Sequence, residues 1–308
     1  MRRIAVFLLL LPLLLIALHR PAYQRKFSAE VLPQPSAEPP QLQVYITADN
    51  SIAAMDIETY VAGVVAGEMP GAWPLEALKA QAILARTFVL KFVTEKESRY
   101  PGADISTDIA EAQAYDAAAV NERIRQAVQE TAGLILLTED GQLPYTWFHS
   151  HSGGRTESAV HGIDWQGAEP TYTKITDGLE PDDAAWHAEF TVNEFITACQ
   201  GAGAKVSTCK SVRVSQKGKS GRAVTLLVDG TTVNAARLRI SLGSSRMRST
   251  LLTELNIEDG IIRMSGHGYG HGVGMSQWGA YALAQQGMSG EEISLHYYTG
   301  LKLVRAWE

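Results

Sequence analysis

The sequence predicts an α+β fold, a single mixed catalytic domain with helices and antiparallel hairpins. Helix caps and hairpin turns alternate along the chain without the regular rhythm of a parallel α/β sheet. The 308 residues are 45% hydrophobic and 19% charged, as in ordinary globular proteins. We therefore expect one folded domain at residues 42–308, preceded by a membrane helix and a linker.

The first 20 residues have the pattern of an export signal. Arg2 and Arg3 precede an apolar run from Ile4 to Leu18, and no small-residue cleavage site follows it. This favours an uncleaved anchor at residues 1–20 over a removed signal peptide. Because the arginines come first, we expect a single-pass cell-membrane protein with its catalytic domain outside the cytoplasm.

Residues 21–41 read as a linker, because they contain five prolines and little periodic apolar pattern. Such a segment would hold the domain away from the membrane. The net charge of −6, without a basic stripe, disfavours a nucleic-acid partner.

The two cysteines leave alternatives open. Cys199 and Cys209 lie in an exported region, where a disulfide persists, but two free thiols fit equally well. The spacing excludes a cysteine-rich zinc site.

Two helices are predicted near the start of the domain. Asp56 caps a helix from residue 57 to about 67, and Pro74 suits the first turn of a second one at 75–93. The second carries an apolar stripe at steps of three and four. The elbow between them contains a single acid, Glu68.

Later segments give further local signals. Asp-Gly at 140–141 predicts a hairpin between 134–138 and 144–148, and a polar stretch at 217–221 predicts another between 212–214 and 223–228. Two helices are expected near the end, at 278–286 before Gly287 and after the capping box at 289–292.

Glu68 is the candidate catalytic acid. Valines precede it and Trp73 and Pro74 follow it, and apolar surroundings raise the pKa of a carboxyl group. A general acid at neutral pH needs such a shift. The alternative is that Glu68 ends a helix and points to water.

Two polar, glycine-containing segments are candidate ligand loops. The first, 148–157, contains His149, Ser152, Gly153 and Gly154, and reads either as a binding loop or as a polar turn. The second, 266–280, alternates glycines with His267 and His271 before Ser276 and Gln277. A loop of this kind either approaches a substrate closely or binds a metal. We expect it to wall a groove opposite Glu68.

These segments resemble the SpoIID/LytB domain family. The resemblance lies in five ordered blocks spread over about 240 residues: 61–70 with 73–82 and 85–88, 113–116, 150–157, 266–280 and 296–300. The family's catalytic glutamate falls on Glu68. Some members resemble zinc-binding proteins, with cysteine and histidine near the Ser-Gly-Gly motif. Here both cysteines lie far from that motif, so no metal or other cofactor is predicted.

The resemblance implies a sporulation enzyme, a lytic transglycosylase of peptidoglycan. Such enzymes cut the MurNAc-GlcNAc bond of peptide-stripped glycan strands and leave a 1,6-anhydromuramic end, during septal thinning and engulfment at the sporulation septum. The implied partners are the amidase SpoIIP and the membrane protein SpoIIM. One acid suffices when the sugar's own C6 hydroxyl is the nucleophile, whereas hydrolysis ordinarily uses two.

Other polar residues of the motifs are candidate substrate-binding groups. They are Lys79, Arg86, His149, Ser152, Gly153, Gly154, His267, His271, Ser276 and Gln277. Two rival functions stay open. One is a non-catalytic amidase-enhancer or peptidoglycan-binding module, and the other is a zinc-dependent hydrolase using His149, His267 and His271.

Overall fold

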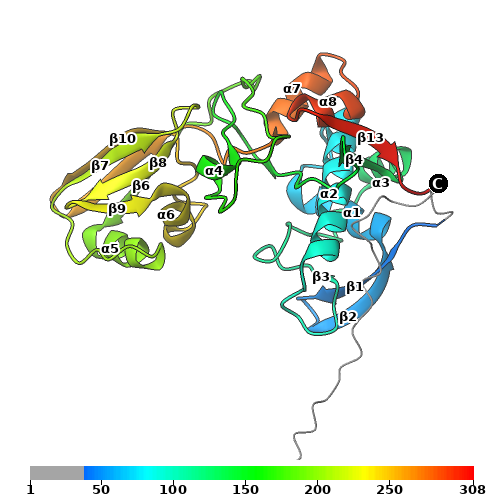
Figure 1. Ribbon diagram of the computed structural model, residues 1–308, viewed down its shortest axis with the longest axis horizontal. Coiled ribbons are helices and arrows are strands. Elements are labelled where there is room, and N and C mark those ends of the chain that lie inside the picture. The colour runs from blue at the N-terminus through cyan, green and yellow to red at the C-terminus, as the bar shows by residue number, and fades with distance from the viewer. Residues whose placement is uncertain (1–37) are drawn as a thin grey trace, which may run out of the picture.

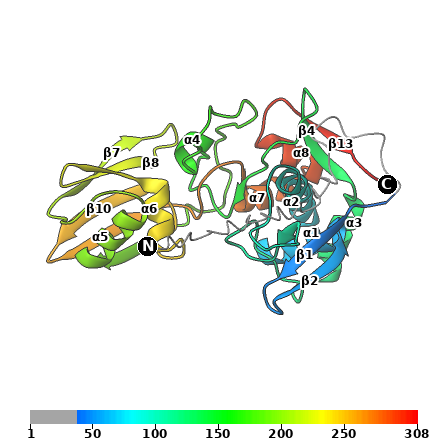
Figure 2. The same cartoon turned by 60° about the horizontal axis from the view of Figure 1, so that its bottom comes forward.

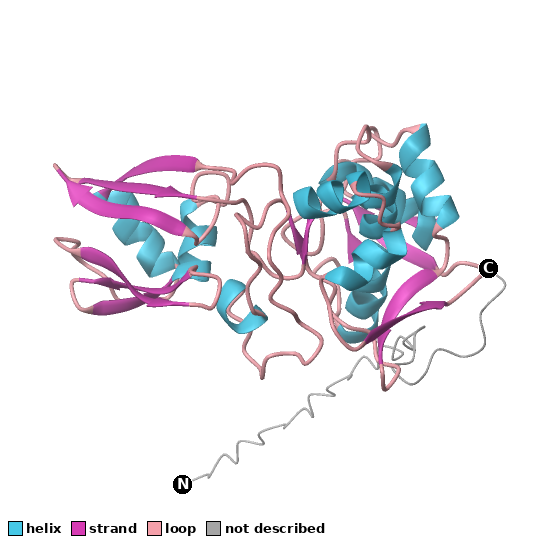
Figure 3. Ribbon diagram, turned by 90° about the horizontal axis from the view of Figure 1, so that it is seen from above, coloured by secondary structure: helices cyan, strands magenta, loops and turns pink. Residues whose placement is uncertain are grey.

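Two hydrophobic cores organise the part of the chain that the structure describes (Figure 1). The computed structural model describes residues 38–308. The first core takes its residues from 42–137 and 275–307, and the second takes its residues from 186–264. Figures 2 and 3 show the two cores side by side, joined by mostly irregular chain. The range expected as one domain thus contains two cores, the second inserted between the two halves of the first.

The first core is built around a long central helix, α2. Its helices are α1 (Ile57–Glu68), α2 (Leu75–Glu95), α3 (Glu122–Glu130), α7 (Gln277–Gln285) and α8 (Gly290–His296). The expected caps are confirmed, because Asp56 accepts a hydrogen bond from the Thr59 amide and Ser289 begins a capping box. Helix α2 packs against the other four helices, which explains why most of its residues are buried.

Two small sheets complete the first core. Its strands are β1 (Gln41–Ile46), β2 (Ser51–Asp56), β3 (Ile105–Ser106), β4 (Leu134–Thr138) and β13 (Leu301–Arg305). Strand β1 lies between β2 and β3, and β4 pairs antiparallel with β13. The C-terminal strand therefore closes a sheet whose other strand lies more than 160 residues earlier.

The prediction that residues 134–138 pair with 144–148 in a hairpin is wrong. The turn itself forms, since the Gly141 amide donates to the Thr138 carbonyl. Strand β4, however, pairs with β13 instead of with 144–148. Leu301 and Leu303 pack against the first core, and this burial favours the distant strand over the local one.

The second core contains two three-stranded sheets and two helices. Its elements are β6 (Trp186–Thr191), α5 (Val192–Gly201), β7 (Val212–Lys217), β8 (Ala223–Val228), β9 (Thr231–Asn234), α6 (Ala235–Leu242), β10 (Leu252–Glu258) and β11 (Ile261–Gly266). The sheet orders are β10-β11-β6 and β7-β8-β9. The predicted hairpin of β7 and β8 is confirmed. Cys199 and Cys209 are free and buried here, and burial raises the pKa of the Cys199 thiol to about 12.

Between the cores run two connecting segments. They carry β5 (Phe148–His149), α4 (Ala159–Gly162) and β12 (Met275–Ser276), and β5 pairs parallel with β12. Mixed helices and mainly antiparallel sheets confirm the α+β class. The predicted membrane helix lies outside the described residues. Within residues 38–308, no helix combines the length and apolar character that crossing a bilayer requires.

Candidate active site

Glu68 is the last residue of α1, and its carboxyl group is held by two amides. Its Oε1 accepts a hydrogen bond of 2.8 Å from the Ala114 backbone amide. Its Oε2 accepts one of 3.3 Å from the side-chain amide of Gln277, at the start of α7. The side chain therefore turns back against the protein at the junction of three segments. These contacts argue against the alternative in which it only ends a helix and points to water, although the residue is partly exposed.

The surroundings of Glu68 shift its acidity in opposite directions. Burial raises the pKa of Glu68, because the charged form loses hydration. The hydrogen bonds from Ala114 and Gln277 favour the carboxylate and lower the pKa, but burial is the larger effect. The net shift is upward, which suits a group that must carry a proton near neutral pH.

The missing side chain of Gly67 makes the Ala114 contact accessible. A Cβ atom at Gly67 would lie 2.7 Å from the Tyr115 backbone nitrogen, closer than non-bonded atoms come. The chain at 114–115 thus passes directly over the end of α1. The sequence indicated the block 113–116 only as a motif. In the structure, this block brings the Ala114 amide to the carboxyl group of Glu68.

Gln277 connects Glu68 to the interior of the first core. Its side-chain nitrogen also lies 3.4 Å from the Gln81 Oε1 atom, on α2, and Gln81 is fully buried. Ser276 caps α7 by accepting a hydrogen bond from the Gly279 amide. The position of Gln277 is therefore set by the first turn of α7. Gln277 is the residue of the second glycine-containing segment that contacts Glu68.

Glu180 fixes the same turn from the other side and was missed by the sequence analysis. Its Oε1 accepts hydrogen bonds from the Ser276 hydroxyl at 2.6 Å and from the Ser152 amide at 2.9 Å. One carboxylate therefore joins the two predicted loops. Glu180 lies in an irregular segment and outside the conspicuous blocks, so no local pattern indicated it.

The two predicted loops pack against each other. His151 and Tyr269 exchange a pair of backbone hydrogen bonds of 2.9 Å, and the Trp278 amide donates to the Ser150 carbonyl. The Gly153 amide donates to the ring of His151, whereas Gly154 is exposed.

At the alternate glycines of the second loop, the space that a side chain would occupy is taken by other parts of the protein. Gly272 has a left-handed φ of +84°, and a Cβ atom there would lie 2.4 Å from Nε of Arg222. The glycines on either side face other parts of the chain in the same way: Gly268, Gly270 and Gly274. We expected a sugar ring to approach the backbone closely at these glycines. Neighbouring protein residues occupy those positions instead.

A buried arginine of the second core lies against the histidines. Arg222 donates a 2.6 Å hydrogen bond to the Ser152 carbonyl. The rings of His149 and His271 lie 5.5 Å apart between their centroids. Burial and nearby arginines lower the pKa of His271 to about 3, and burial also lowers the pKa of His149. Both imidazoles are therefore neutral at physiological pH.

His267 lies apart from this pair, with its Nδ1 3.0 Å from the Asp183 carboxylate. Among the described residues, no group of three or more histidines, cysteines or acids is arranged to hold a metal ion. The three histidines proposed as zinc ligands thus do not form a ready ligand set.

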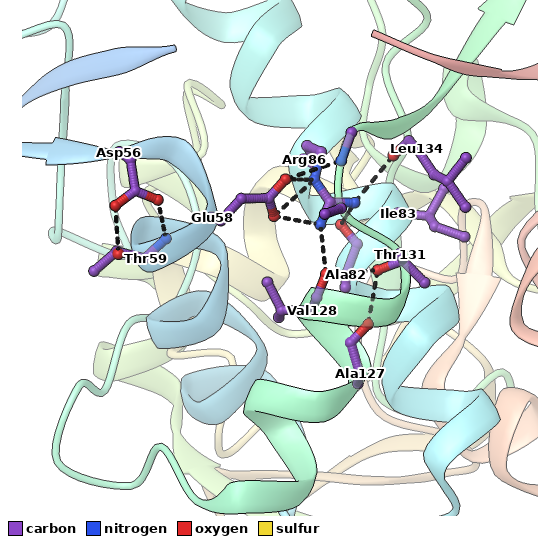
Figure 4. Close-up of polar contacts among 12 residues, drawn as sticks. Asp56, Glu58, Thr59, Ala82, Ile83, Arg86, Ala127, Val128, Thr131 and Leu134 are labelled. Carbon is purple, nitrogen blue, oxygen red and sulfur yellow. Dashed lines mark hydrogen bonds and ion pairs between the residues drawn. The ribbon is translucent and has the colours of Figure 1, made fainter. Parts of the chain in front are cut away.

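Arg86, a predicted substrate-binding residue, is part of a buried ion pair instead (Figure 4). Its side chain is fully buried and lies 2.5 Å from the Glu58 carboxylate. Glu58 also accepts hydrogen bonds from the Gly133 amide and the Trp307 indole. Glu58 and Glu68 are ten positions apart in α1, which is about 15 Å along a helix. Arg86 therefore joins elements of the core rather than the site.

Lys79 also has protein partners. Its ammonium group lies 2.8 Å from Glu76 and 2.6 Å from Glu130. Glu76 in turn accepts a hydrogen bond from the Gly290 amide at the start of α8. Lys79 thus links α2, α3 and α8, and the structure does not bring it to Glu68.

Two family models match this chain. The model described as stage II sporulation protein matches residues 45–137, which contain α1, α2 and Glu68. A second model, described as a domain of unknown function (DUF8618), matches residues 183–274. The boundary between them follows the division between the two cores.

Curated relatives extend this match over most of the chain. Stage II sporulation protein D of Bacillus amyloliquefaciens is 31% identical over 304 residues, covering 94% of this chain and 86% of that protein. Its counterpart in Bacillus subtilis (strain 168) is 30% identical, covering 88% and 80%. The amidase enhancer of Bacillus subtilis (strain 168) is 27% identical, covering 78% and 40%. The chain belongs to the stage II sporulation protein D family, as the sequence motifs predicted.

Proposed function

We propose that this chain is a lytic transglycosylase that cleaves the MurNAc-GlcNAc bond of peptide-stripped peptidoglycan strands. The observation that supports this most directly is the carboxyl group of Glu68, whose pKa is raised by burial and whose polar contacts are amides. An acid in this state can donate a proton and then take one back.

The reaction needs both steps from one group. Glu68 protonates the glycosidic oxygen, and the bond to C1 of the muramic acid breaks. The resulting carboxylate accepts the proton of the C6 hydroxyl as that oxygen bonds to C1, which closes the 1,6-anhydro ring. The amides of Ala114 and Gln277 stabilise the carboxylate between the two steps.

Replacing Glu68 with glutamine tests the assignment. Glu68→Gln keeps the shape of the side chain and removes the transferable proton, so anhydromuramic products should disappear while the fold and glycan binding persist. Mass spectrometry of digests of purified, peptide-free strands gives the products, and circular dichroism gives the fold. Wild-type product levels from the folded variant would eliminate Glu68 as the acid.

A non-catalytic role is the second candidate, supported by the match to the amidase enhancer. In that case the chain would bind peptidoglycan and stimulate an amidase without cutting glycan. Glu68→Gln separates the two functions, because an enhancer would keep its full stimulation of a purified amidase. Loss of all wall-degrading activity in the variant would favour the transglycosylase.

The proposed setting is the sporulation septum, with the domain outside the cytoplasm and anchored by residues 1–20. SpoIIP would supply peptide-free strands, and SpoIIM would assemble with both proteins in the membrane. These partners rest on the family resemblance. Co-purification of the full-length chain with SpoIIP and SpoIIM from sporulating cells tests them, and recovery in the soluble fraction would oppose the anchor.

A further inference from the structure

Three aromatic side chains gather on the two segments that carry Glu68 and its partner Gln277. The ring of Trp73 lies 4.7 Å from that of Trp278 and 5.2 Å from that of Tyr281, measured between centroids. Trp278 and Tyr281 are 5.4 Å apart. All three are partly exposed, so the cluster presents ring surface to solvent.

Their positions are fixed by the segments that hold Glu68. Trp73 ends the elbow that begins at Glu68, and its amide donates to the Pro70 carbonyl. Trp278 directly follows Gln277, the residue that contacts the acid, and Tyr281 lies one turn farther along α7. The cluster therefore joins the elbow that follows Glu68 to the first turns of α7, which carry Gln277.

Core packing does not account for the whole cluster. Trp73 also packs against the first core, but among the described residues Trp278 and Tyr281 belong to neither hydrophobic cluster. Large aromatic rings left at the surface of a site indicate a ligand with an apolar face.

A second aromatic group shows what distinguishes this one. Tyr145 stacks on Trp147, and Trp165 meets both rings edge-on. Two lysines, Lys91 and Lys96, lie over the ring of Tyr145 at 5.0 and 5.4 Å. Cation contacts among the described residues fall on rings other than Trp73, Trp278 and Tyr281. Their electron-rich faces remain available to the polarised C–H groups of an uncharged sugar ring.

We propose that Trp73, Trp278 and Tyr281 form a sugar-stacking surface that binds the apolar face of an N-acetylhexosamine ring next to the bond that is cleaved. This proposal rests on the proposed function and names the contact through which the strand is held. The rings position the sugar, while Glu68 transfers the proton.

The test measures binding without turnover. Glu68→Gln protein is titrated calorimetrically with peptide-free glycan strands, alone and combined with Trp278→Ala or Tyr281→Ala. Each aromatic truncation should weaken binding at least tenfold, and Trp278→Phe should retain most of the affinity. Tyr100→Ala is the matched control, because Tyr100 stacks on Tyr45 of β1 rather than near Glu68.

The outcomes separate this surface from the catalytic assignment. Unchanged affinity in both folded alanine variants overturns the surface and leaves the assignment of Glu68 untouched. An absence of glycan binding by the folded Glu68→Gln protein overturns the surface and also contradicts the binding expected of that variant. Weaker binding in the alanine variants, with no anhydromuramic product from the wild-type protein, supports the surface and rejects the proposed reaction. If Trp278→Ala lowers the unfolding midpoint, Tyr281→Ala and Trp278→Phe decide the question.

Discussion

At the scale of single residues, the acidity of Glu68 depends on its contact with Gln277, which is far away in the sequence. Gln277 lies 209 residues later and lowers the pKa that burial raises. Glu68→Gln tests the proton itself, whereas a change at Gln277 tests how the proton is tuned.

We expect Gln277→Leu to shift the pH profile of glycan cleavage. Loss of the amide donor destabilises the carboxylate, so the pKa of Glu68 rises further. A reaction that begins from protonated Glu68 is retained below this pKa and is lost as the pH rises through it. The alkaline limb of kcat/KM should therefore move to higher pH. Gln126→Leu, on the exposed side of α3, is the control, and an unmoved or lower limb would contradict the tuning role.

Activity is expected to survive EDTA. Burial is the main reason that the pKa values of His149 and His271 are lowered, and the positive charge of Arg222 lowers both further. The same charge opposes a bound cation. Product release from glycan strands, measured before and after chelation, gives the answer. A zinc-dependent enzyme treated in parallel shows that chelation worked. Activity that disappears with EDTA and returns with zinc alone would support the metal hypothesis.

At the scale of secondary-structure elements, the Arg86–Glu58 pair holds α1, α2 and the C-terminal end together. Arg86→Met leaves the Glu58 carboxylate unpaired in a largely buried position, which costs about 3–5 kcal/mol of unfolding free energy. Urea unfolding measures this loss. Glycan affinity of the folded variant should be unchanged.

A surface pair provides the comparison for Arg86. Arg99 is half-exposed and pairs with Asp108, so Arg99→Met should cost about 1 kcal/mol or less. If Arg86→Met instead kept wild-type stability but bound glycan more weakly, Arg86 would return to the list of substrate-binding residues.

Local signals in the sequence were sufficient for several elements. The Asp56 cap, the β7–β8 hairpin and the capping box at 289–292 each depend on residues only a few positions apart, and all three are confirmed. The pairing of β4 with β13 was not predictable in this way, because competing burial decides between a near and a distant partner.

The site was predictable in part for the same reason. Apolar neighbours in the chain indicated the raised pKa of Glu68, and the chemistry of the second loop indicated Gln277. Glu180 and Arg222 act through contacts that exist only after folding, and nothing in their local sequence distinguishes them from surface charges. Arg86 shows the converse, because this basic residue within a motif pairs with Glu58 in the core and not with a substrate.

At the scale of the whole molecule, the second core supports the site loops of the connecting segments. The β7–β8 turn reaches Glu157 through Ser220, whose hydroxyl donates a 2.7 Å hydrogen bond to the buried carboxylate. Burial alone would raise the pKa of Glu157, but the hydrogen bonds from Ser220 and Ser158 lower it overall. An ionised acid thus couples the second core to the connecting segments.

Ser220→Ala should destabilise the protein by about 1.5–3 kcal/mol at neutral pH, as expected for a hydrogen bond to a charged group. Because the folded pKa of Glu157 is lowered, this stabilisation exists above the unfolded pKa and is lost as the pH falls through the folded one. Urea unfolding at neutral and acidic pH should therefore show a difference that disappears in acid. Ser215→Ala in β7 is the control, and an equal loss at every pH would contradict the mechanism.

The insertion of the second core also sets the order in which the molecule can be completed. As the chain emerges from the ribosome, every strand and helix of the second core is present once residue 266 has appeared. The first core must still wait for α7, α8 and β13. Glu68 is made early but receives Gln277 only with this last part. An unfinished chain would therefore carry the acid without its partner, and the proposed cleavage of glycan would become possible only once α7 has been made.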